Sequence, residues 1–68
     1  MNNFEMIRFF KPVALKLVDK KGITMGQTYS NHEWVQIILV PHANGLVDLC
    51  FADGFCAEKI SREIFEVA

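Results

Sequence analysis

Residues 35–52 contain the strongest structural signal in the chain, an Asn-Gly pair between two apolar runs. Residues 35–40 are apolar except for Gln36, and residues 46–52 form the returning run. A type I′ turn needs positive φ at both central positions, and Asn and Gly tolerate that conformation best. The pattern therefore predicts a β-hairpin whose two-residue turn is Asn44-Gly45.

The register of this hairpin decides which side chains share a face, because side chains alternate along a strand. With Asn44-Gly45 as the turn, one face would hold three pairs, Ile38–Phe51, Val40–Leu49 and His42–Val47. The other face would place Ile37 opposite Ala52 and Leu39 opposite Cys50. Both faces are apolar, so another part of the chain must cover the second face. The sequence FEMIRFF at residues 4–10 is the spare element for that role.

The length and composition favour a binding module over an enzyme. The chain has 68 residues, of which 51% are hydrophobic and six are Phe. A single domain of this size leaves little room for an enclosed active site beside its core. Its apolar surface is also larger than a small domain hides by itself. We expect another protein, or a second copy in a homodimer, to cover the excess.

The N-terminal residues 1–11 form a hydrophobic arm in this interpretation, ahead of a domain at residues 12–68. The arm fits a strand or a short helix begun by Asn2 or Asn3, and it must end at Lys11 because Pro12 follows. Its apolar side chains either fold back onto the sheet or dock into a second subunit or a target protein. Those side chains are Phe4, Ile7, Phe9 and Phe10.

The C-terminal residues carry two competing patterns. Asp53-Gly54 is a second hairpin signal and would begin a strand at Phe55. Apolar residues at helical spacing instead predict a helix over residues 57–67. Those residues are Ala57, Ile60, Ile64 and Val67. The fold class is therefore mainly β or, as the alternative, α+β with an antiparallel meander and a C-terminal helix.

Four short motifs decide between these patterns, and they are Asp19-Lys20-Lys21-Gly22, Gly26-Gln27-Thr28-Tyr29, Asp53-Gly54 and Phe65-Glu66-Val67. In this order they resemble the small SH3-like barrel domains of phage, prophage and bacterial proteins. The resemblance implies a five-stranded barrel over residues 12–68. It also implies that Ser61-Arg62-Glu63 forms a 3-10 turn before a closing strand, which pairs with the first strand at residues 13–19.

The function that follows is a small, non-catalytic interaction module of phage or prophage type, which binds and modulates a host or phage protein. Aromatic side chains dominate the energy of protein interfaces. We therefore expect the protein-binding residues to be Phe9, Phe10, Tyr29, Trp34 and Phe55. Burial in the core is the competing explanation for each of them.

Nucleic-acid binding is the alternative function, since small barrels stack bases on aromatic side chains beside basic ones. The candidates are Arg8, Lys11, Lys16, Lys20 and Lys21, which gather in the first third of the chain. The net charge of −1 and the acidic remainder disfavour this alternative.

Cysteines and histidines give no sign of a metal, a cofactor or catalysis. A two-residue turn at Asp53-Gly54 would place Cys50 and Cys56 on opposite faces, so no disulfide is expected. His32 and His42 do not form with them the close pairs of a zinc site. The spacing of these four residues, with Asp48 and Asp53, does not assemble a catalytic group. The sequence shows neither a signal peptide nor a membrane span, and we expect a cytoplasmic protein.

Overall fold

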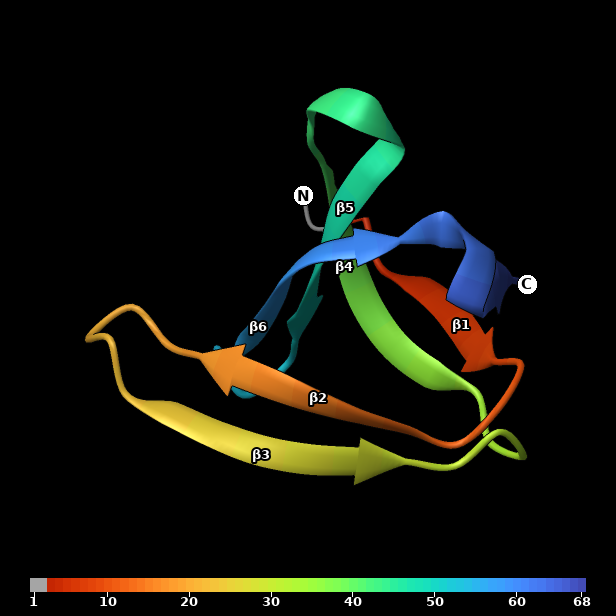
Figure 1. Cartoon of the computed structure of the whole chain (residues 1–68), viewed down its shortest axis with the longest axis horizontal. Coiled ribbons are helices and arrows are strands. Elements are labelled where there is room, and N and C mark those ends of the chain that lie inside the picture. The colour runs from red at the N-terminus through yellow and green to blue at the C-terminus, as the bar shows by residue number, and fades with distance from the viewer. Residues whose placement is uncertain (1–2) are drawn as a thin grey trace.

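In the computed structural model, which describes residues 3–68, seven strands form one antiparallel sheet that curls into a half-barrel (Figure 1). The strands are β1 (Glu5–Phe9), β2 (Val13–Val18), β3 (Thr24–Tyr29), β4 (Val35–Pro41), β5 (Leu46–Phe51), β6 (Cys56–Ser61) and β7 (Phe65–Val67). Their order in the sheet is β3-β2-β6-β5-β4-β1-β7. Two 3-10 turns, η1 (Ala43–Gly45) and η2 (Arg62–Ile64), complete the chain. The mainly β class is confirmed, although the strands number seven and not five.

Three hairpins of this sheet have loops of the same length and hydrogen bonding. In each, the residue before a three-residue loop donates its N–H to the carbonyl after the loop. The three bonds are Asp19 to Ile23 at 3.0 Å, His42 to Leu46 at 2.8 Å and Phe51 to Phe55 at 2.9 Å. The third loop residue is Gly22, Gly45 or Gly54, with φ of 83°, 74° and 92°. A glycine at this position permits the left-handed conformation that rejoins the two strands.

The central hairpin is confirmed, but the predicted two-residue turn is wrong. Asn44 has φ of 65° and Gly45 is also positive, as expected, yet Ala43 belongs to the loop too. The extra residue shifts the register by one, so that Ile37 lies opposite Phe51 and Leu39 lies opposite Leu49. A shift of one residue exchanges the two faces of a strand. The predicted faces are therefore wrong for β4: Ile37 and Leu39, not Ile38 and Val40, share a face with Phe51 and Leu49.

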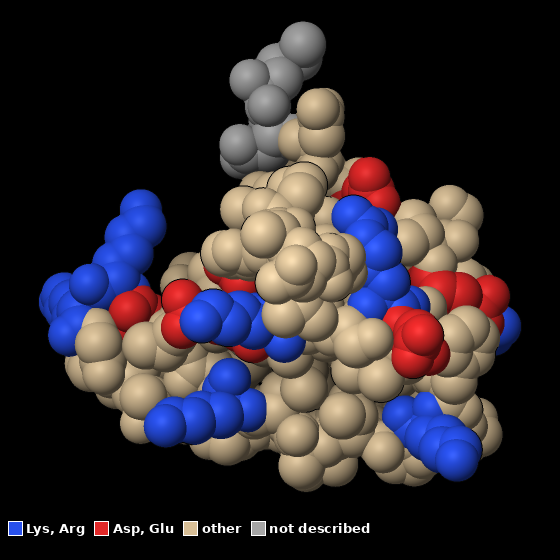
Figure 2. All heavy atoms as spheres, turned by 45° about the horizontal axis from the view of Figure 1, so that its top comes forward, with Lys and Arg blue, Asp and Glu red and all other residues tan. Residues whose placement is uncertain are grey.

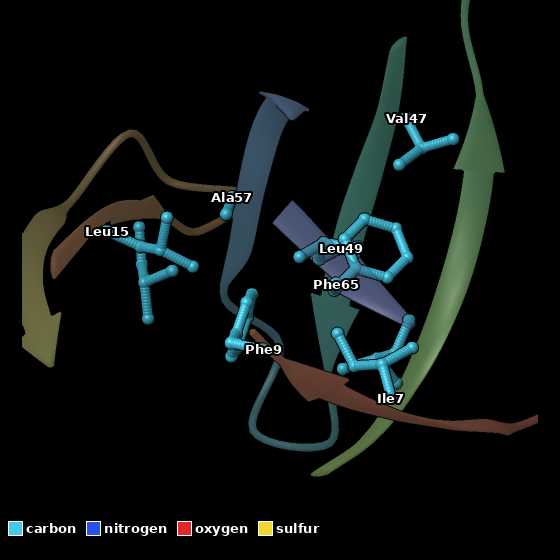
Figure 3. Close-up of a cluster of buried hydrophobic side chains, with 9 residues drawn as sticks. Ile7, Phe9, Leu15, Val47, Leu49, Ala57 and Phe65 are labelled. Atoms are coloured by element: carbon cyan, nitrogen blue, oxygen red, sulfur yellow. The ribbon is translucent and has the colours of Figure 1, made fainter. Parts of the chain in front are cut away.

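Apolar side chains from six strands fill the concave side of the half-barrel (Figure 3). Alternation explains the selection: Leu15 and Leu17 point inward from β2, as their sequence pattern predicts, whereas Lys16 points outward. Phe9 lies at the centre, with its ring 5.7 Å from that of Tyr29 and 6.4 Å from that of Phe65. The buried residues are Ile7, Phe9, Leu15, Leu17, Ile37, Val47, Leu49, Ala57 and Phe65.

The N-terminal segment is a strand within the sheet and does not lie over it. β1 pairs with β4 on one side and with β7 on the other. Ile7 and Phe9 point inward and are buried, whereas Met6 and Phe10 are exposed. The expectation of a short helix is wrong for these residues, because they are extended. The segment was also expected to cover the second face of the hairpin. This expectation is wrong, because β1 lies beside β4 in the same sheet and covers neither face of it.

The C-terminal residues form strands, so the alternative of a helix over residues 57–67 is wrong. A bulge interrupts the pairing of β5 with β6 between Val47 and Leu49, and Lys59 there has φ of 56°. One extra residue in β6 turns both Ala57 and Ile60 toward the interior, although they are three positions apart. The bulge thus gives an extended chain the spacing of a helix.

The expected 3-10 turn before the last strand is present as η2. The Ser61 hydroxyl accepts a hydrogen bond from the N–H of Glu63 at 3.2 Å and caps the turn. β7 then pairs with β1 and not, as expected, with residues 13–18, because β1 occupies the position between β4 and β7. No helix in residues 3–68 is long and apolar enough to cross a membrane.

Cys50 and Cys56 form a disulfide, which corrects the expectation that they lie on opposite faces. The three-residue loop Ala52–Gly54 replaces the assumed two-residue turn and puts the two cysteines directly opposite each other. Their Cα atoms are 4.1 Å apart, close to the separation typical of a pair between ladder hydrogen bonds. The argument for a reducing compartment loses this support, because disulfides are typical of oxidising ones.

Replacing Gly54 by alanine tests the importance of these loops. An added Cβ at φ of 92° is strained, and we expect Gly54→Ala to lower the free energy of unfolding by about 1–2 kcal/mol in urea titrations. Gly26→Ala is the matched control, because Gly26 has no positive φ and open space around it. Equal losses in the two variants would contradict the assignment.

Reducing the disulfide tests its contribution to stability. Closing the short loop between Cys50 and Cys56 restricts the unfolded chain, so we expect a reductant to lower the free energy of unfolding by about 2 kcal/mol. The variant with both cysteines changed to serine serves as the control and should not respond to the reductant. If the reductant leaves the free energy of unfolding of the wild-type protein unchanged, the two thiols are not joined in solution.

Candidate functional site

The outer, convex face of the sheet carries a row of exposed apolar side chains on β1 and β4. Met6 lies opposite Gln36 in the pairing of these strands, and the same register places Phe4 beside Ile38. Val40 extends the row along β4. Phe4, Met6, Trp34 and Val40 are among the most exposed large apolar residues of residues 3–68, and Ile38 is half-buried between them. We call these five residues the outer patch.

The outer patch follows directly from the sequence once the register is known. Residues 4, 6, 8 and 10 of FEMIRFF share the outward face of β1, and only Arg8 among them is charged. On β4, Ile38 lies opposite Cys50 of β5, so the disulfide borders the patch. Sequence analysis missed Ile38 and Val40 as site residues, because the hairpin register it assumed was one residue out. It named Phe4 only as part of the N-terminal arm, and it missed Met6 because no strand alternation was assigned to that segment.

One end of the outer patch is held by a group of three side chains around Arg8. The guanidinium lies over the ring of Trp34, 4.7 Å from its centroid, and donates to the Glu66 carboxylate at 3.1 Å. Arg8 thus joins β4 to β7 across β1. This arrangement fixes the orientation of the indole, which is 40% exposed. A rigid, half-exposed aromatic ring loses little entropy when it contacts a partner.

The five predicted protein-binding residues divide between the interior and the surface. Phe9 is 1% exposed and belongs to the core, so it is not available to a partner. Tyr29 stacks on Phe51 with ring centroids 5.1 Å apart, and Phe55 also packs against the core. Burial raises the pKa of the Tyr29 phenol, and the Asp53 carboxylate adds to the effect.

Phe10 and Trp34 are the two predicted residues that remain exposed. Phe10 is 54% exposed at the end of β1, where it lines an open groove with its neighbours. The groove is lined by Phe10, Lys11, Pro12, Val13, Glu63 and Ile64. Trp34 lies directly before β4, on the outer patch. The structure therefore does not gather the five predicted aromatic residues into one surface.

The basic side chains proposed for nucleic-acid binding are also dispersed. Arg8 is paired with Glu66. Lys16 lines a hollow beside Glu58, whereas Lys20 and Lys21 lie in the loop between β2 and β3. Figure 2 shows basic side chains standing apart on the visible face, several of them next to acidic ones. This arrangement does not form the continuous basic track that follows a phosphate backbone.

A second group missed by the sequence analysis surrounds Asp48 at the bulge. Asp48 Oδ1 accepts the backbone N–H of Lys59 at 3.0 Å and lies 2.7 Å from Nε2 of His42. The carboxylate thereby satisfies the donor that the bulge frees from the ladder. No group of three metal-ligating side chains occurs among residues 3–68. The contacts of Asp48 join His42, directly after β4, to the bulge in β6.

Comparison of the chain with models of protein families, with curated proteins and with solved structures found no match.

Lowering the pH tests the Asp48 group. Burial raises the pKa of Asp48, but the hydrogen bonds from His42 and Lys59 outweigh it, so the pKa lies below its ordinary value of 3.8. Such a carboxylate stabilises the fold above its unfolded pKa and loses that contribution as the pH falls through the folded pKa. We expect the free energy of unfolding, measured in urea, to decline below about pH 4.

The variant Asp48→Asn removes the titrating group and should flatten this decline, while costing about 1 kcal/mol at neutral pH through weaker hydrogen bonds. Glu58→Gln is the matched control, because Glu58 is an exposed carboxylate on β6, next to Lys59. An acid decline equally steep in Asp48→Asn would contradict the assignment.

Proposed function

We propose that this chain is a small, non-catalytic protein-interaction module, and that the outer patch is its binding surface. The observation that carries the proposal is the cluster of exposed apolar side chains across β1 and β4, in which Phe4 lies beside Ile38 with Met6 and Val40 next to them, while Gln36 separates this cluster from Trp34 along β4. Contiguous apolar surface of this kind is typical of interfaces, whereas single exposed apolar residues are ordinary. The partner is another protein, whose own apolar surface seats Met6 and Trp34.

The position of the outer patch in the sheet supports this proposal. Sheets in small proteins usually have one face on the core and one face in water, with polar side chains outward. Here the inner face already uses Ile7 and Ile37, yet the outward positions beside them carry Met6 and Ile38. Apolar side chains at these outward positions add nothing to the core. Contact with a partner accounts for their presence.

The β5–β6 ladder and the Arg8 group give the outer patch a rigid frame. Cys50 and Cys56 lie opposite each other in that ladder at one margin, and Arg8 with Glu66 ties β1 to β7 at the other. A surface held in one shape before binding loses less conformational entropy on association. These two margins therefore favour a preformed interface over one that orders on contact.

The proposed family is the SH3-like barrels of phage, prophage and bacterial proteins. Two features support it: the η2 turn comes directly before the closing strand β7, and β7 pairs with β1, the first strand of the chain. In this interpretation β1, β4, β5, β6 and β7 are the five barrel strands, and the β2–β3 hairpin is inserted between the first two. The barrel then differs from the one expected at residues 12–68: β1 comes from the N-terminal arm, and the motifs at residues 19–22 and 26–29 lie in the inserted hairpin. A module of this type would bind and modulate a host or phage protein.

The cytoplasm is the proposed location, in which case Cys50 and Cys56 would be a dithiol. Either redox state leaves the two residues opposite each other in the β5–β6 ladder, because the loop Ala52–Gly54 sets that register. The outer patch therefore does not require the disulfide.

Lysine substitutions on the outer patch test the proposal. We expect Met6→Lys and Ile38→Lys to weaken binding to the partner protein by roughly 30-fold or more, because each places a charge in an apolar interface. The partner is first captured on immobilised protein from lysate of the source cell. Its affinity for each purified variant is then measured by titration calorimetry.

The matched control is Ala14→Lys, an exposed position on β2, outside the outer patch. Circular dichroism establishes that all variants keep the fold. A partner that binds Met6→Lys and Ile38→Lys as tightly as wild type, or one that Ala14→Lys also rejects, would overturn the assignment of the outer patch.

A further inference from the structure

The edge strand β3 differs from the other six strands in its burial. Each other strand contributes a buried side chain to the core, whereas Thr24–Tyr29 has none in the part of the chain that the structure describes. The β2–β3 hairpin joins the rest of the sheet through the single β2–β6 pair Val18–Cys56. Two-stranded ribbons have little stability of their own. Pairing with a second strand on its free edge would stabilise a six-residue strand in this position.

The register shows which backbone groups of β3 face away from the sheet. Asp19 donates its N–H to Ile23, so the ladder bonds to β2 fall on alternate residues from Ile23, which are Met25, Gln27 and Tyr29. The N–H and C=O groups of Thr24, Gly26 and Thr28 consequently point to the free edge, because β3 ends the strand order.

The free edge of β3 lacks the usual protection against pairing with another strand. Proteins protect edges with lysine, proline, bulges or very short strands. The sequence TMGQTY has no charge and no proline, and its pairing with β2 is regular over all six residues. The opposite edge is different, since β7 has three residues and its Glu66 is engaged by Arg8. Strand addition is therefore open at β3.

We propose that the free edge of β3 pairs antiparallel with the β3 edge of a second copy, about a two-fold axis at Gly26. In this register Thr24 lies opposite Thr28 of the second copy, and Gly26 lies opposite Gly26 of the second copy. All outward N–H and C=O groups of the three residues are then satisfied at once. Glycine at the axis leaves the centre of the joint sheet open, because no atom lies within 4 Å of its missing Cβ.

The side chains of this register are complementary. Threonine opposite threonine is a favourable cross-strand pair, and it occurs twice across the axis. Ile23, which is 56% exposed, comes opposite Tyr29 of the second copy. The arrangement thus covers an apolar side chain that the single chain leaves in water.

Charge favours the antiparallel direction and a second copy as the occupant. Lys20 and Lys21 lie in the loop before β3, and antiparallel pairing separates the loops of the two copies by the length of the strand, roughly 20 Å. That distance exceeds the screening length in physiological salt. Each basic loop also approaches the far end of β3 in the second copy, where Glu33 lines an open hollow. Parallel pairing would bring the four lysines together.

Hydrogen exchange of the full chain tests the pairing directly. The amides of Met25 and Gln27 should be protected at every concentration, because they bond to β2. The amides of Gly26 and Thr28 should exchange rapidly at low concentration and become protected as a dimer forms, followed by analytical ultracentrifugation. A chain that stays monomeric up to about 1 mM would overturn the proposal. A dimer that leaves these two amides unprotected would also overturn it.

The double variant Thr24→Lys/Thr28→Lys places like charges opposite each other across the axis. We expect its dimer dissociation constant to rise about tenfold or more. Met6→Lys is the control and should dimerise as the wild type does, because it changes only the outer patch. A dimer lost in Met6→Lys but kept in the double variant would assign self-association to the outer patch, against this proposal. Should the double variant not fold, exchange of the wild-type amides still decides.

Discussion

The register of the sheet depends on the glycine that ends each of its three-residue loops. Gly22, Gly45 and Gly54 all have positive φ, and each loop starts with a backbone bond from the residue before it to the residue after it. Side chains alternate along a strand with a period of two. A loop with an odd number of residues and a loop with an even number therefore place a given side chain of the returning strand on opposite faces of the sheet. These loops therefore decide which apolar residues enter the core, and they also decide that Cys50 meets Cys56.

A second constraint is the bulge in the pairing of β5 with β6. The bulge at Lys59 adds one residue to β6, and the Asp48 carboxylate bonds to its N–H. Without the extra residue, Ile60 would point outward while Ala57 pointed inward. The bulge brings both into the core and lets β6 follow the curl of the half-barrel. A half-buried carboxylate thus satisfies the N–H that the bulge frees from the ladder.

The sequence predicts the elements of this fold better than their pairing. The Asn44-Gly45 hairpin and the alternation of β2 are visible in local patterns, because φ preference and burial act on neighbouring residues. The turn before β7 was expected only from the resemblance to SH3-like barrels. Loop length is not visible in the same way, since Asn-Gly and Asp-Gly fit two-residue and three-residue loops alike. The outer patch was missed for that reason: Ile38 and Val40 were placed on the wrong face. The bulge at Lys59 imitated a helix, because Ala57 and Ile60 are three residues apart.

The two surfaces that this fold leaves incomplete are of different kinds and lie on different parts of the sheet. The outer patch on β1 and β4 exposes apolar side chains, whereas the edge of β3 exposes backbone donors and acceptors. β3 is first in the strand order and β1 is sixth, with β2, β6, β5 and β4 between them. Trp34 and Thr28 line the same open hollow, so a second copy on β3 approaches the Trp34 end of the outer patch and leaves Phe4, Met6, Ile38 and Val40 open. The dimer would then present two outer patches, and a partner with two matching sites would bind it more tightly than either patch alone.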